Sequence, residues 1–299
     1  MSHVADQSIL LVGTISNVEK IVERELYNVI SSLSRFKSID IFLVESDSLD
    51  KTHEVLKKLK ASIPFLNFVN LGVLKPTIPD RIERIRYSRN IYVNYICDNY
   101  ETSKWNFVVV ADLDGMNSKL KSKAIDSCFG TNLKWDACMA NQKHGYYDLY
   151  ALREAEWMPK DCFEELAELK LTVERKPNKS KGLFGFIRAF LFYDKLREKA
   201  IYSKMRVIKV GSHWIKVQSA FGGLGIYRTN LFLTSNYDRI EPYGNQRSEH
   251  IDFHSKCVAN GASLYINPNL INANWNIYNL NKFKLVRFAR EFLKYLRGL

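Results

Sequence analysis

The sequence predicts an α/β fold built on a mixed, mostly parallel sheet flanked by helices. Over the first half of the chain, short apolar runs rich in β-branched residues alternate with longer stretches of helical periodicity. Each strand–helix–strand unit returns the chain to a parallel strand through a right-handed crossover. The 299 residues, 46% of them hydrophobic, are enough for one large domain and too apolar for a disordered chain.

The expected elements follow one another in order. Strands are expected at 9–12, 39–44, 66–71 and 107–111, and helices at about 18–33, 53–61 and 79–99. Further strands are expected within 133–153 and 206–228, separated by a helical, strongly basic insertion at about 155–205 whose loop is 176–182. The expected division is one domain over 1–280, followed by a basic amphipathic helix at 281–299.

The charge and cysteine content narrow the partners and the compartment. A net charge of +12 favours an anionic partner, which could be nucleic acid, an anionic membrane or a phosphorylated substrate. Five scattered cysteines without a CxxC pair do not fit a disulfide framework or a zinc ribbon, so we expect reduced thiols in the cytoplasm. The sequence has no run of about twenty apolar residues, so we expect no membrane-spanning helix. The N-terminus lacks the basic start of a signal peptide.

Two carboxylates follow the expected fourth strand in the segment VVVADLDGMN at 108–117. Asp112 and Asp114 project to the same side if strand geometry persists. A hard cation such as Mg²⁺ or Mn²⁺ relieves the repulsion between them and keeps coordination sites for phosphate oxygens. The structural alternative is a solvated acidic turn in which Gly115 supplies the bend.

Polar residues also follow the second strand, in ESDSLDKT at 45–52. Glu45 and Asp47 lie where a nucleotide-binding sheet holds a ribose or a base edge, because ligands collect beyond the carboxyl ends of parallel strands. Capping of the next helix explains Asp50 equally well. In RIERIRYSRN at 81–90, Arg86 and Arg89 share a helix face, which suits phosphate recognition but is also typical of a solvated basic surface.

Four segments follow one another in this order: GTISN at 13–17, ESDSLDKT at 45–52, the arginine helix ending in RN at 90, and DLD at 112–114. Together they resemble the GT-A-fold nucleotide-sugar glycosyltransferases. The later segments look like the fungal capsule-associated mannosyltransferase group and its bacterial relatives; they are WDA at 135–137, YYDLYALR at 146–153, VQSAFGGLGIYR at 217–228 and SEHIDFH at 248–254. The similarity covers roughly 8–275 and leaves the insertion and the tail outside.

The resemblance implies a role for each matching residue. Asp112 and Asp114 would be the metal-binding pair, with Asp114 the direct ligand and Asp112 nearer the donor sugar. The implied donor-binding residues are Thr14, Glu45, Asp47, Arg89, Asp112, Gly222 and Gly223. The two glycines would admit the donor or acceptor close to the backbone, although a bulge in a core strand explains them nearly as well.

The segment at 248–254 adds candidate catalytic and metal-binding residues. The resemblance implies that Glu249 faces the acceptor as a general base and that His250 or His254 completes the metal shell. The structural alternative is a helix whose first turn favours carboxylates and whose histidines pack in the core. Asp148 is the expected acceptor contact, which makes Glu249, Asp112 and Asp148 the candidate catalytic residues.

The tail carries much of the positive charge. Apolar residues form one stripe of the expected helix and lysines and arginines flank it, which fits an anionic membrane face as well as a helix docked on the domain. The aromatic segment GLFGFIRAFLF at 182–192 is a second candidate, for a lid or for a lipid contact. Together they suggest an acceptor carried on a lipid, as in lipopolysaccharide or capsule assembly, and a protein at the cytoplasmic face of the inner membrane.

The sequence therefore predicts a Mn²⁺- or Mg²⁺-dependent glycosyltransferase that moves a hexose from a UDP or GDP sugar to a saccharide acceptor. A Glu249 base favours inversion, whereas the mannosyltransferase group that the chain resembles is retaining, so the stereochemistry stays open. A nucleotidyltransferase is the alternative enzyme, but GTISN at 13–17 does not supply a glycine-rich, lysine-bearing phosphate loop. A basic nucleic-acid-binding protein is the alternative outside enzymes; since its motifs are not visible, we expect no nucleic-acid partner.

Overall fold

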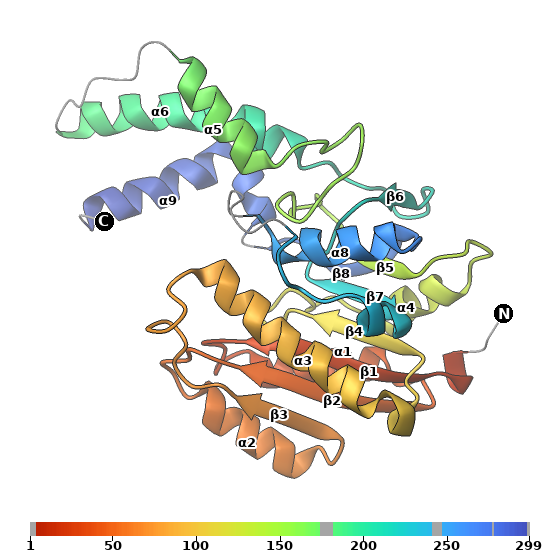
Figure 1. The fold of residues 1–299 in the computed structure, drawn as a ribbon. Coiled ribbons are helices and arrows are strands. Elements are labelled where there is room, and N and C mark those ends of the chain that lie inside the picture. The colour runs from red at the N-terminus through yellow and green to blue at the C-terminus, as the bar shows by residue number, and fades with distance from the viewer. Residues whose placement is uncertain (1–3, 174–181, 241–246, 277, 298–299) are drawn as a thin grey trace.

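The computed structural model describes residues 4–173, 182–240, 247–276 and 278–297 (Figure 1). One eight-stranded sheet has the order β3-β2-β1-β4-β7-β5-β8-β6. The strands are β1 (Ser8–Ile15), β2 (Ser38–Glu45), β3 (Leu66–Asn70), β4 (Phe107–Ala111), β5 (Ala137–Gln142), β6 (Ile215–Val217), β7 (Leu224–Arg228) and β8 (Leu264–Ala273). The helices are α1 (Val22–Ser32), α2 (Thr52–Ser62), α3 (Arg81–Ser103), α4 (Ser122–Phe129), α5 (Cys162–Thr172), α6 (Gly182–Ala200), α7 (Asn230–Thr234), α8 (Glu249–Ala259) and α9 (Lys284–Leu296).

The parallel half of the sheet positions the candidate site. β1 pairs in parallel with β2 on one side and with β4 on the other, and β2 pairs in parallel with β3. The strand order therefore reverses between β1 and β4, which is where open α/β sheets bind ligands. The carboxyl ends of β1, β2 and β4 meet at one edge, as the sequence predicts.

The second half of the sheet is mixed. β7 lies antiparallel between β4 and β5, β8 is parallel to β5, and β6 closes the edge antiparallel to β8. The predicted fold class, a mixed and mostly parallel sheet flanked by helices, is confirmed.

Apolar side chains cover both faces of the sheet, which is why its central strands are apolar runs without alternation. In β1, Leu10 and Val12 point into the core under α3, α7 and α8. Ile9 and Leu11 point into the opposite core, which α1, α2 and α4 cover. The polar side chains near β1 and β4 therefore stand at the ends of these strands.

The first four strands and three helices stand within a few residues of the predicted positions. The predictions for 133–153 and 206–228 were wrong in part, because only 137–142, 215–217 and 224–228 form strands. Residues 143–153 and 206–214 are mostly irregular; the N–H of Tyr146 donates to the carbonyl of Arg206, outside any ladder. β8 and α4 were not predicted, since Asn267, Pro268 and Asn269 interrupt the strand pattern of β8.

The insertion and the tail form one helical layer at the end of the molecule away from β3 (Figure 1). α5, α6 and α9 have the helical character that the sequence predicts; most of the expected loop at 176–182, and residues 298–299, lie outside the described residues. Phe288 and Phe292 of α9 pack against Phe186 of α6. Among the described residues, no helix combines the length and the apolar character that crossing a membrane requires.

Candidate active site

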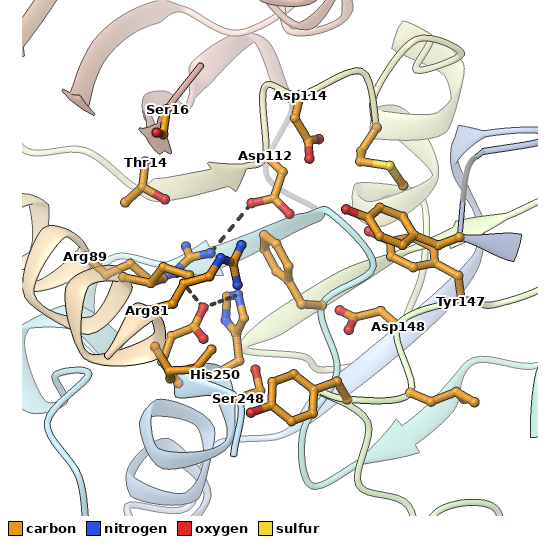
Figure 2. A pocket seen from close by; sticks show the side chains of 18 of the residues that line it. Thr14, Ser16, Arg81, Arg89, Asp112, Asp114, Tyr147, Asp148, Ser248 and His250 are labelled. Carbon is orange, nitrogen blue, oxygen red and sulfur yellow. Dashed lines mark hydrogen bonds and ion pairs between the residues drawn. The ribbon is translucent and has the colours of Figure 1, made fainter. Parts of the chain in front are cut away.

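A cavity of about 980 Å³ opens at the carboxyl edge of the parallel strands (Figure 2). Thr14 of β1 and Ser16, the residue after β1, line the cavity. Asp47 lines it from the turn after β2, and Asp112 and Asp114 line it from the loop after β4. Helices α3 and α8 and the segment 147–150 supply further walls. The structure thus brings together residues from these six separate parts of the sequence.

Asp112 and Asp114 lie on the cavity wall, where the apolar strand β4 delivers them. Burial and the carboxylate of Asp114 raise the pKa of Asp112 to about 8, and the nearby Arg89 offsets only part of this rise. Burial also raises the pKa of Asp114. Two carboxylates that oppose each other's ionisation are the situation that a bound cation relieves.

Asn117, a fully buried residue, fixes the loop that carries this pair through three hydrogen bonds. The Asn117 N–H donates to the Glu25 carboxylate, and Asn28 Nδ2 donates to the Asn117 carbonyl at 2.6 Å. Asn117 Nδ2 in turn donates to the Asp112 carbonyl at 2.6 Å. Two side chains of α1 therefore hold the acidic loop in position.

Arg89 connects the acidic loop to α8. Its Nε is 2.9 Å from Glu249 Oε1, and its Nη2 is 3.6 Å from Asp112 Oδ1. Arg86, one turn earlier, is likewise buried and lies 2.6 Å from Asp252 Oδ2. The solvated basic surface considered for this helix is therefore wrong for both arginines, because each neutralises a buried carboxylate.

Asp148 lines the cavity from the irregular segment after β5. Its Oδ2 accepts the Gly222 N–H at 2.9 Å and its Oδ1 accepts the Ala151 N–H at 3.3 Å. Desolvation raises the pKa of Asp148, and these two N–H groups only oppose the rise. A carboxylate that is oriented but holds its proton more tightly than usual is suited to general-base work near neutral pH.

The two histidines of α8 have different surroundings. His250 lines the cavity, stacks on Phe221 with ring centroids 3.9 Å apart, and has no hydrogen-bond partner for either ring nitrogen among the described residues. His254 is outside the cavity lining, and its ring nitrogens contact Ser219 Oγ at 2.9 Å and the Tyr227 hydroxyl at 3.0 Å. Because both nitrogens are engaged, His254 in this arrangement cannot complete a metal shell.

Three further predicted donor contacts do not line the cavity. Glu45 is buried at the end of β2. Gly222 and Gly223 adopt positive φ values of 70° and 82°, and a Cβ at Gly223 would lie 3.0 Å from Met116 Cβ. Close packing of Gly222 against β5, and of Gly223 against Met116 and Tyr147, accounts for the glycine pair. The Gly223 carbonyl accepts the Asp112 N–H at 3.0 Å. Thr14, Asp47 and Arg89 do line the cavity.

Sequence reasoning missed two cations of the cavity. Arg81 begins α3, and its charge lowers the pKa of Asp114 against the larger effect of burial. Arg197 reaches the cavity from α6. Neither guanidinium has a hydrogen bond or an ion pair within the described residues, which leaves both free for an anion. The available signal was that Arg81 directly follows the helix-capping Asp80, at the positive end of a helix.

The insertion supplies the other half of the cavity. Apolar and aromatic side chains of α5 and of the residues just after α6 line this part of the cavity, together with Tyr150 from the segment after β5; they are Phe163, Leu166, Ile201, Tyr202 and Met205. The cavity is thus polar at the sheet edge and largely apolar at the insertion.

Comparison with known proteins adds little to this geometry. No family model and no curated protein sequence matches the chain. Among solved structures, a Pyrobaculum calidifontis mannosyltransferase with GDP-Man and Mn²⁺ is 11% identical, with TM-score 0.45 over 98% of this chain and 65% of that one. TarS of S. aureus with UDP-GlcNAc is 11% identical, with TM-score 0.46 over 90% and 59%.

A mannosyl-3-phosphoglycerate synthase from Rubrobacter xylanophilus is 13% identical, with TM-score 0.38 over 98% of this chain and 74% of that one. The chain spans less than two thirds of the mannosyltransferase and of TarS. At these identities and scores the similarities carry no argument about chemistry, and the resemblance to the fungal capsule-associated group stays a prediction.

Proposed function

We propose that the protein is a metal-dependent glycosyltransferase that moves a hexose from a nucleotide-diphosphate sugar to a saccharide acceptor in cell-surface polysaccharide synthesis. One observation carries the proposal: an acidic pair and the guanidinium of Arg81, which has no partner in the described part of the chain, face the same cavity at the switch point of the sheet. Free cations beside adjacent carboxylates fit a ligand that brings both phosphate charge and a divalent ion.

The donor lies against the sheet edge in this proposal. Thr14 and Ser16 hydroxyls and the polar turn at Asp47 bind the nucleoside. Asp47 is itself fixed by the N–H groups of Leu74 and Lys75, at 2.9 and 3.0 Å from its Oδ1, and by Arg84 at 3.1 Å. Arg81, at the N-terminus of α3, binds the diphosphate, where guanidinium geometry and the helix dipole act in the same direction.

The acidic pair fits Mn²⁺ or Mg²⁺ held by two carboxylates and by donor phosphates. Among the described residues, no cluster of three or more His, Cys, Asp or Glu side chains forms a cation site by itself. Mg²⁺ is commonly bound in this way, by one or two carboxylates together with substrate phosphates. The ion would stabilise negative charge on the departing diphosphate.

The acceptor occupies the half of the cavity that the insertion forms. We assign the general base to Asp148, because its raised pKa favours uptake of a proton from an acceptor hydroxyl. Glu249 is less suited to that role, since its Oε1 is bound to Arg89 at 2.9 Å. Glu249 then acts as a contact that orients a sugar hydroxyl.

The helical layer favours a peripheral position on an anionic membrane surface, at the cytoplasmic face. Three leucines of α9 are exposed, namely Leu285, Leu293 and Leu296. The same part of the chain carries the basic residues Arg290, Lys294 and Arg297. A lipid-linked acceptor would be presented to the insertion half of the cavity from that surface.

Thermal shift with a panel of UDP- and GDP-hexoses, with and without Mn²⁺, tests the proposal. We expect one donor to raise the melting temperature only with the metal, and we expect the effect to disappear in Asp114→Asn. Asp98→Asn, which removes an exposed carboxylate of α3, is the matched control. A donor response that is indifferent to Mn²⁺, or unchanged in Asp114→Asn, excludes the metal role.

A further inference from the structure

A second groove, of about 630 Å³, lies between the C-terminal half of α6 and the start of α9. Four lysines line it: Lys195 and Lys199 from α6, and Lys282 and Lys284 from the segment that begins α9. It shares no lining residue with the candidate active site. Its chemistry therefore needs a separate explanation.

The carboxylates of this groove are already neutralised. Arg287, a buried residue, places Nε 2.6 Å from Asp194 Oδ1 and Nη2 2.6 Å from Glu198 Oε2. Within the ranges that the structure describes, none of the four lysine side chains has a hydrogen bond or an ion pair. The five cations and two carboxylates leave the groove with a charge of +3, which attracts an anion from outside the chain.

Apolar side chains adjoin these lysines. Phe184, Leu191, Lys195 and Lys199 share one face of α6, because their spacings of seven, four and four residues follow the helical repeat. Phe184 is 88% exposed, and Leu285, which follows Lys284, is 83% exposed. An inorganic anion would leave these two side chains in water, whereas a lipid supplies both a phosphate and acyl chains.

We propose that the groove between α6 and α9 binds the phosphate headgroup of an anionic phospholipid, so that α6 as well as α9 lies on the bilayer. The lysines contact lipid phosphates while Phe184, Leu191 and Leu285 enter the interface. This inference deepens the membrane part of the proposed function and does not depend on glycosyl transfer. The groove, rather than the overall charge of the chain, sets the preference for anionic lipid.

Co-sedimentation of the full chain with vesicles tests the inference. The vesicles are phosphatidylcholine alone, or phosphatidylcholine with about a quarter of phosphatidylglycerol. Lys195→Gln/Lys199→Gln should weaken binding to the anionic vesicles on the order of tenfold, and Lys195→Arg/Lys199→Arg should retain it. The matched control is Lys57→Gln/Lys58→Gln, which removes the same charge from the exposed side of α2.

Equal losses in the groove variant and the control would overturn the inference, because they would show an effect of net charge alone. Displacement of the vesicles by inorganic phosphate at the same phosphate concentration would also overturn it, in favour of a free anion. Donor hydrolysis without vesicles should be the same in the groove variant and the wild type. Failure of the proposed function would instead appear as absent hydrolysis in the wild type, with the vesicle preference intact.

Discussion

Arg89 Nε lies 2.9 Å from Glu249 Oε1, and both side chains are buried. This ion pair joins α3 to α8 beside the cavity, and Arg89 Nη2 reaches toward Asp112 as well. A buried carboxylate is expensive without its cation. The pair therefore couples the stability of the domain to the arrangement of the cavity.

Replacing Arg89 with methionine should destabilise the protein by about 3 kcal/mol or more, because Glu249 is left buried and unpaired. Urea unfolding followed by circular dichroism measures this loss. Arg35→Met removes an arginine from the exposed Arg35–Asp126 pair and should change the unfolding free energy by less than about 1 kcal/mol. Equal losses of unfolding free energy from the two substitutions would mean that the buried Arg89–Glu249 pair stabilises the protein no more than an exposed pair does.

Much of the fold could be predicted from the sequence because strand and helix patterns in the first half are local. The strands at 9–12 and 107–111 are apolar runs between polar turns, and the structure has both. The acidic pair was identifiable because it follows a recognisable apolar run, whereas Asp148 was named from the resemblance of YYDLYALR at 146–153. β8 was not, since its Asn–Pro–Asn sequence contradicts strand propensity and only pairing with β5 and β6 makes it a strand.

The site was less predictable because burial decides the role of each polar side chain. His254 and His250 have helical spacing that favours a shared metal, yet Ser219 and Tyr227 engage His254. Arg81 looked like one arginine among several, and only the cavity distinguishes it from Arg86. Residue spacing does not report which arginine finds a carboxylate inside the protein and which is left for a ligand.

Arg81→Ala should weaken donor binding by roughly ten- to a hundredfold, because a charge-assisted contact to phosphate is lost. The unfolding free energy should change little, since Arg81 is exposed and has no partner in the described structure. Titration calorimetry with the donor found in the thermal-shift panel measures the affinity. Lys58→Ala removes one exposed positive charge from α2 and should leave donor affinity unchanged; a similar loss in both variants would indicate a long-range charge effect.

Asp148→Asn should lower the transfer rate by a factor on the order of a hundred to ten thousand, while donor binding is retained. Asn keeps the shape of Asp148 and can accept one of the two backbone N–H groups through its Oδ1, but it cannot take a proton. In the wild type, activity should fall as the pH is lowered through the raised pKa of Asp148, since the base must be ionised. Transfer rates and donor affinity measured in the same samples separate this role from simple misfolding, and a larger rate loss in Glu249→Gln would reassign the base to Glu249.

Gly223→Ala should destabilise the protein by roughly 3 kcal/mol. Its φ of +82° disfavours any side chain, and the added Cβ would lie 3.0 Å from Met116 Cβ and 3.1 Å from the Tyr147 hydroxyl. Gly261→Ala is the control, because Gly261 has a φ of +89° with no atom within 4 Å of the added carbon. That control should cost only about 1 kcal/mol from backbone strain, so equal losses in chemical denaturation would exclude the packing role of Gly223.

Acidification should destabilise the protein through the two histidines of α8. Burial and the charge of Arg89 lower the pKa of His254 to about 3 and hold the pKa of His250 well below its ordinary value. Below about pH 6.5 the unfolded chain binds these protons and the folded chain does not, so stability falls by about 1.4 kcal/mol per pH unit for each imidazole. The contribution is fully present above pH 6.5 and is lost progressively as the pH falls toward the folded value.

Urea unfolding at several pH values between 5 and 7 measures this slope. His254→Gln lowers the unfolding free energy at every pH. It should also reduce the slope of that free energy against pH by the contribution of about one proton. His213→Gln, at an exposed site, should leave the slope unchanged. A slope identical in the wild type and in His254→Gln would mean that His254 is protonated in the folded protein. Because a protonated imidazole cannot accept hydrogen bonds, its contacts to Ser219 and Tyr227 would then have to be donated by the histidine.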